Sequence, residues 1–94
     1  MLYSGTLNKT TPVTAEIGTV HSFLLINTNN VTAYVKFART SNAPVFPVPA
    51  GGSIECPTNI TNVVDLITGI SVNKTVTFDP ESTDFTEPIG VTLW

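Results

Sequence analysis

The sequence predicts an all-β fold, namely a single antiparallel β-sandwich of the jelly-roll type with seven to nine short strands. The chain holds 16 Thr and 11 Val, and both favour strands because their branched Cβ packs well on a pleated surface. No window free of Gly, Pro or β-branched clusters repeats apolar residues at positions i, i+3, i+4 and i+7. Turn residues instead recur at short, regular intervals, as is typical of sandwiches and barrels.

Composition narrows the classes of protein that the chain could represent. Its 94 residues suffice for one domain, so we expect residues 1–94 to form a single unit. A mean hydropathy of +0.24 with a net charge of −3 is the opposite of a disordered chain. Four basic residues against seven acidic ones leave no basic patch, so no nucleic-acid partner is expected. No apolar run is long enough to span a membrane or to act as a secretory signal.

The first half of the chain contains the clearest strand pattern. Candidate strands lie at 2–7, 13–17 and 19–26. The tetrad Asn27-Thr28-Asn29-Asn30 follows, and because Asn tolerates left-handed φ we expect a tight hairpin that returns along residues 31–38.

The returning strand alternates strictly, so Val31, Ala33, Val35 and Phe37 are expected to share the core face. Residues 45–49 include two prolines, which lack ladder donors, and this indicates an edge strand or a strap across the sandwich.

The second half continues with short strands. Residues 50–52 turn the chain into a strand at 53–56, and a longer strand is expected at 63–72. A hairpin at Asn73-Lys74, with 75–78 returning, would keep Lys74 out of the core. Residues 90–94 form the last expected strand.

Two of these strands are apolar on both faces, which is unusual for a small domain with one core. Phe23 and Leu25 lie opposite in parity to Val20, and Val63 and Ile67 lie opposite to the main apolar set of 63–72. An apolar outer face indicates a second buried surface. The residues expected to contact a partner are Phe23, Leu25, Val63, Ile67 and Trp94. The alternative is a β-bulge that reverses the parity midway, or isolated surface residues of no consequence.

Catalytic chemistry has little support in the sequence. His21 is the sole histidine and could meet Ser71 and Asp65, but no Gly-x-Ser-x-Gly elbow accompanies them, and a chain rich in Thr and Ser offers such trios by chance. Cys56 is the sole cysteine, and a small buried hydrophobic role is expected for it. We therefore expect no enzyme, no catalytic residue and no cofactor.

Four acidic residues gather in one short segment, Asp79, Glu81, Asp84 and Glu87. Calcium prefers carboxylate and carbonyl oxygens in flexible loops, but the spacing fits no EF-hand. A solvated loop, or a contact with a basic partner, is therefore expected instead of a metal site.

Four segments carry a resemblance to a known group of proteins. They are AYVKFA at 33–38, APV at 43–45, VPAGGSIE at 48–55 and LITGISV at 66–72. Within residues 31–78 this succession resembles the small all-β accessory proteins of tailed-phage particles. The resemblance implies a capsid decoration, or cement, protein with a jelly-roll or similar sandwich, which binds the major capsid protein on the outside of the head. It implies a dimer or trimer located in the virion, made in the host cytoplasm without a signal peptide, and with no catalytic residues.

A second hypothesis belongs to a different class, a carbohydrate- or receptor-binding module of a phage tail or fibre. Sugar sites combine aromatic faces with amide and carboxylate partners. Asn59, Asn62, Tyr34 and Trp94 could supply such groups.

Overall fold

The structure, a computed structural model, describes residues 2–8, 18–39, 43–56, 64–79, 81 and 85–94. In this part of the chain all regular elements are strands, with no α-helix, and every pairing between them is antiparallel. The strands are β1 (Tyr3–Leu7), β2 (Gly18–Val20), β3 (Phe23–Ile26), β4 (Ala33–Ala38), β5 (Val45–Val48), β6 (Ser53–Glu55), β7 (Val64–Ile67), β8 (Gly69–Asn73) and β9 (Ile89–Leu93). The expected all-β class is confirmed, whereas the expected strand at 13–17 lies outside the described residues.

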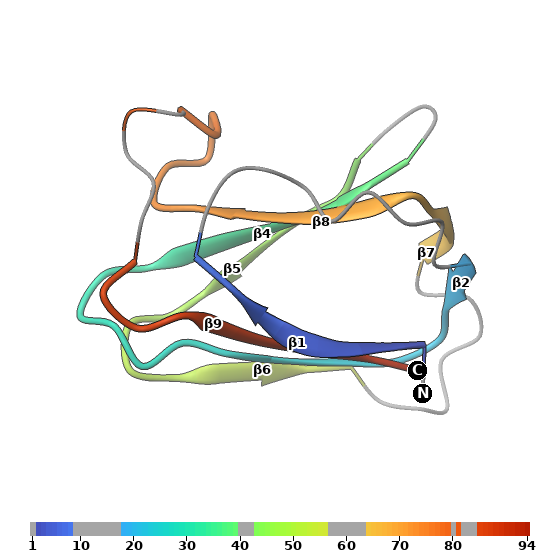
Figure 1. Ribbon diagram of the computed structural model, residues 1–94, viewed down its shortest axis with the longest axis horizontal. Helices are drawn as coiled ribbons and strands as arrows, with labels where there is room; N and C mark the ends of the chain where they lie inside the picture. The colour runs from blue at the N-terminus through green and yellow to red at the C-terminus, as the bar shows by residue number, and fades with distance from the viewer. Residues whose placement is uncertain (1, 9–17, 40–42, 57–63, 80, 82–84) are drawn as a thin grey trace.

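The strands form a four-stranded sheet in the order β1-β9-β3-β6, a three-stranded sheet in the order β5-β4-β8, and the pair β2-β7. Figure 1 shows the two larger sheets as facing layers. The pair β2-β7 closes one end, where β2 leads into β3 and β7 leads into β8. The last strand of the sequence, β9, therefore occupies an inner position between β1 and β3.

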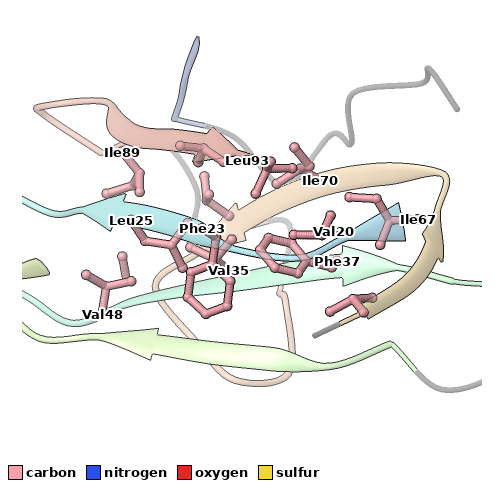
Figure 2. Close-up of a cluster of buried hydrophobic side chains, with 14 of the residues drawn as sticks. Val20, Phe23, Leu25, Val35, Phe37, Val48, Ile67, Ile70, Ile89 and Leu93 are labelled. Atoms are coloured by element: carbon pink, nitrogen blue, oxygen red, sulfur yellow. The ribbon is translucent and has the colours of Figure 1, made fainter. Parts of the chain in front are cut away.

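Apolar side chains from both layers meet between the sheets, as Figure 2 shows. Three aromatic rings pack together, those of the buried Phe23 and Phe37 and of the half-buried Phe46. Their centroids are 4.8 to 5.6 Å apart, in edge-on or tilted arrangements. Such aromatic pairs add about 0.5–1.5 kcal/mol each beyond the area they bury.

The expected continuous strand at 19–26 is interrupted by a bulge, and this corrects the prediction of an outer apolar face there. The backbone N–H groups of both His21 and Ser22 donate to the carbonyl of Trp94, at 2.7 and 3.2 Å. His21 and Ser22 thus lie opposite a single residue, Trp94, and the extra residue reverses which side chains of the following strand face the core. Phe23 and Leu25 consequently point into the core, with only 4% and 0% exposure.

A second interruption has the same effect on the strand expected at 63–72. Thr68 is exposed and separates β7 from β8, so that Ile67 and Ile70 are both fully buried. The prediction that Ile67 lies on an outer face is therefore wrong. Val63 lies outside the described residues.

The expected hairpin at 27–30 is also wrong, because β3 and β4 belong to different sheets. Residues 27–32 instead cross from one layer to the other, and the side chain of Asn27 fixes the crossing. Its Nδ2 donates to the carbonyl oxygens of Val31 at 2.8 Å and Val48 at 3.1 Å. Val31, expected in the core, is 41% exposed because the strand begins only at Ala33. The rest of the expected core face, Ala33, Val35 and Phe37, is confirmed as fully buried.

The turn expected after residue 73 exists, but no strand returns from it. The Asn73 Oδ1 accepts hydrogen bonds from the backbone N–H of Thr75 at 2.8 Å and from its hydroxyl at 3.1 Å. The Phe78 N–H donates to the Thr75 carbonyl at 3.1 Å, which folds residues 75–78 into a turn. Lys74 is exposed, as expected.

The proline-containing strand β5 lies at the edge of its sheet, as predicted. After it, residues 49–52 carry the chain back to the four-stranded sheet. The Gly52 N–H donates to the Pro49 carbonyl at 3.0 Å, and Gly51 adopts φ 66°, a conformation that glycine adopts without steric cost.

Candidate functional site

The outer face of the four-stranded sheet is the candidate site, and it is nearly free of charge. Strand alternation sends Tyr3, Val91 and Leu93 towards the core, so the residues between them point outward. The outward set is Leu2, Ser4, Thr6, Leu24, Ile26, Ser53, Glu55, Gly90, Thr92 and Trp94. Glu55 is its only ionisable residue.

The pairing registers place these residues in rows across the sheet. Ser4 lies beside Thr92, which lies beside Leu24 and then Glu55. In the next row Ile26 lies opposite Gly90, which has no side chain to cover it. The result is a surface of hydroxyl and aliphatic groups with one carboxylate at its border.

Three large apolar side chains on this face are accessible to solvent. Leu2, Ile26 and Trp94 are each 42% exposed. The Leu2 N–H donates to the Leu93 carbonyl at 2.8 Å, which holds Leu2 beside the end of β9. The Trp94 backbone is held there, since its N–H donates to the Ser22 carbonyl at 2.9 Å. Exposed apolar groups rimmed by polar ones mark interaction surfaces.

In the opposite layer, the outward positions of β8 are covered. Gly69, Ser71 and Asn73, which alternate with the core residues of β8, are themselves buried. The neighbouring Lys36 places its Nζ 5.3 Å from the centre of the Phe78 ring. The turn after β8 therefore folds back over this layer.

The structure separates the five residues expected to contact a partner. Phe23, Leu25 and Ile67 belong to the core and are unavailable at the surface. Trp94 lies on the outer face, and Val63 is outside the described residues. The outward residues of β3, Leu24 and Ile26, were missed, because the bulge at His21 and Ser22 reverses the parity from which the outer face was deduced.

A second candidate site is a polar hollow formed by the segment after β3 and the segment before β9. A hollow of about 290 Å³ is lined by Thr28, Asn29, Asn30, Thr86 and Glu87. The Asn29 amide is already committed, because its Nδ2 donates to the Glu87 carbonyl at 2.7 Å and its Oδ1 accepts from the Glu87 N–H at 3.0 Å. The exposed Thr28, Asn30, Thr86 and Glu87 remain accessible to a ligand.

The groups suggested for sugar binding are not brought together where they are described. Tyr34 lies on β4 in the three-stranded sheet, and Trp94 follows β9 in the other sheet. Asn59 and Asn62 lie outside the described residues.

The residues considered for metal binding or catalysis lie in several parts of the chain. Among the described residues no three His, Cys, Asp or Glu side chains gather as a metal site. Asp79 Oδ1 accepts the Glu81 N–H at 2.9 Å in a local turn, and Asp84 lies outside the described part. His21 is exposed, and Cys56 is half-buried against the core.

Comparisons with models of protein families, with curated proteins and with solved structures give no match. In the portion of the chain that the structure describes, no helix has the length and apolar character needed to cross a membrane.

Proposed function

We propose that the chain is a structural virion protein, a capsid decoration or cement protein that binds the outer surface of a phage head and stabilises it. In this proposal residues 1–94 form one jelly-roll-like β-sandwich, and the outer face of the four-stranded sheet contacts the major capsid protein. The observation that carries the proposal is this face, which combines one charge with three large apolar side chains, each 42% exposed.

The chemistry of the face suits permanent attachment to a protein shell. Burying hydroxyl and aliphatic groups avoids the desolvation cost of ion pairs, which can exceed their attraction. The rest of the surface keeps the net charge negative, which disfavours contact with packaged DNA.

The face of one copy is small for a specific contact. Its four strands hold three to five residues each, so the sheet measures about 17 Å along the strands and about 19 Å across them. Docking of the sheet face alone would cover about 300 Å² on each partner, or roughly 600 Å² in total, which is below the range for specific interfaces. Many copies on one shell would multiply this contribution.

The first test is the copy number of the chain in purified particles, measured on denaturing gels. Hundreds of copies per particle would support decoration, a dozen or fewer would indicate a tail or portal component, and none would refute a virion role.

The second test uses matched charge substitutions and cosedimentation with heads that lack the protein. Ile26→Glu places a carboxylate on the proposed face and should weaken binding at least tenfold, as expected when an unpaired charge is buried at an interface. Val76→Glu is the control, because Val76 is 62% exposed in the turn after β8. Equal binding by the two variants would contradict docking through the outer face.

The polar hollow favours the alternative, a carbohydrate- or receptor-binding module of a tail or fibre. Its exposed carboxylate and amide are groups that hydrogen-bond sugar hydroxyls. A glycan array with the wild type and with Glu87→Gln tests this function. Hits that disappear in the variant would favour it, and an array without hits would favour decoration.

A further inference from the structure

The free edges of the sheets differ in how well they are protected. In the four-stranded sheet, Ser22 and Trp94 exchange both backbone hydrogen bonds, at 2.9 and 3.2 Å. Bonding then alternates along β9, so that Leu93, Val91 and Ile89 bond to β1. On β1 the backbone groups of Tyr3, Gly5 and Leu7 consequently point to β9. Those of Ser4 and Thr6 point outward, and no described strand pairs with them.

Of the other edge strands of these two sheets, β8 has all five residues buried, and the edges formed by β5 and β6 are obstructed. The Phe37 N–H donates to the Pro44 carbonyl at 3.1 Å, and the same alternation places Pro47 at an outward position of β5, where it has no N–H to offer. Strand β6 has three residues and carries Glu55. Short length, proline and charge are the usual means by which proteins prevent edge pairing.

As far as the described residues go, strand β1 has none of these protections. Its five residues, Tyr-Ser-Gly-Thr-Leu, contain no charge and no proline, and they pair with β9 without a bulge. We propose that β1 pairs antiparallel with β1 of a second copy of this chain, about a two-fold axis at Gly5, and joins two four-stranded sheets into one of eight strands. The inference rests on the proposed function at one point: the decoration protein is expected to form a homo-oligomer, and the β1 edge is where its subunits would join.

The sequence of β1 is self-complementary in this register. Ser4 of one copy would exchange both backbone bonds with Thr6 of the other, so that hydroxyl side chains meet on the outer face. Tyr3 would lie across from Leu7 on the inner face, where both side chains are already half-buried against the core. Such cross-strand pairs stabilise sheets. With no charge on β1, two chains of net charge −3 bring no like charges together across the junction.

Gly5 suits the centre of such a junction. The Tyr3 hydroxyl lies 2.7 Å from where a Cβ of Gly5 would stand, so the ring of Tyr3 extends along its own strand over Gly5. Glycine inside a strand often marks a place where another backbone approaches closely. The pairing would also double the outer face available to a capsid shell.

Sedimentation equilibrium at tens of micromolar tests the inference on the free protein. The wild type should have twice the 10.0 kDa mass of one chain. Thr6→Pro removes only an outward N–H, so we expect an intact β-rich circular dichroism spectrum and a monomeric mass. Ser53→Pro makes the same change on the outward side of β6 and should stay dimeric. A monomeric or trimeric wild type would overturn the inference, as would equal masses for the two variants.

A second pair of variants tests the register and does not depend on proline. Ser4→Lys with Thr6→Lys, and Ser4→Glu with Thr6→Glu, should each be monomeric at low salt because like charges then face one another. Mixing the two should give a heterodimer, and failure of the mixture to associate would contradict the register. A monomeric wild type that still binds heads would refute only the β1 pairing, whereas a dimer that fails to bind heads would refute only the proposed function.

Discussion

The buried amide of Asn27 connects segments that lie far apart in the sequence. Its Nδ2 donates to carbonyls in the crossing segment and at the end of β5, and its Oδ1 accepts both the N–H and the side-chain amide of Asn29, at 3.0 Å each. Asn29 in turn bonds to Glu87 beside β9. The position at which the chain passes between the layers therefore depends on one side chain with 0% exposure.

Replacing Asn27 by Ala should reduce the free energy of unfolding by about 2–4 kcal/mol, because buried donors and acceptors lose their partners. Asn30→Ala is the matched control, since Asn30 is exposed in the same segment, and it should cost less than about 0.5 kcal/mol. Urea unfolding followed by circular dichroism measures both. Equal losses would show that the Asn27 contacts contribute nothing of their own.

Because of the bulge at His21 and Ser22, a charged side chain should be tolerated at position 24 but not at position 23. Phe23→Asp should abolish folding, because it buries a carboxylate without a partner in the aromatic core. Leu24→Asp should remain folded, because Leu24 points outward beside Thr92. Amide chemical-shift dispersion in NMR spectra distinguishes the two states. A folded Phe23→Asp variant would mean that the parity described here is incorrect.

Among the elements, local patterns predicted where strands lie better than which strands they pair with. Both β4 and β5 were located correctly, because the signals that predict them are local. These signals are the alternation in residues 33–38 and the prolines of 45–49. The crossing at 27–32 was mistaken for a hairpin, because two of the partners of Asn27, the carbonyls of Val48 and Pro49, lie far along the sequence. A sequence pattern of turn-forming residues does not contain that information.

The proline of β5 should keep its edge from pairing. Pro47→Thr adds an outward N–H and a good strand former to this edge, so we expect concentration-dependent association on mild heating. Pro47→Lys adds the same N–H together with a charge and should associate less. Static light scattering measures both variants, and identical behaviour to the wild type would show that the edge is protected by something other than Pro47.

At the scale of the whole molecule, the apolar pattern of residues 19–26 predicted an outer apolar face but assigned the wrong residues of β3 to it. Trp94 was placed correctly at the surface. Phe23 and Leu25 were not, because the carbonyl that causes the bulge belongs to Trp94, at the far end of the sequence. A shift of one residue reverses every side chain of a strand, so the outer face could be identified only from the tertiary pairing.

Because Glu55 is the only ionisable side chain among the described residues of the outer face, attachment to heads should be nearly independent of ionic strength. Raising NaCl from about 0.1 to 1 M shortens the Debye length from about 10 to 3 Å. We expect the dissociation constant to change by less than about threefold, measured by cosedimentation. A tenfold loss would indicate that charges outside this face hold the protein on the shell.

The inner position of β9 has a consequence for how the protein is made. Strands β1 and β3 leave the ribosome early, but the only described neighbour of β1 is β9, and β3 has only β6 beside it until residues 89–93 have been synthesised. The nascent chain therefore keeps the edges that β1 and β3 present to β9 unpaired through most of its synthesis, a situation in which chains aggregate or engage chaperones. Completion of the four-stranded sheet is thus a late event, and any truncation before residue 89 should yield a chain that cannot close its core.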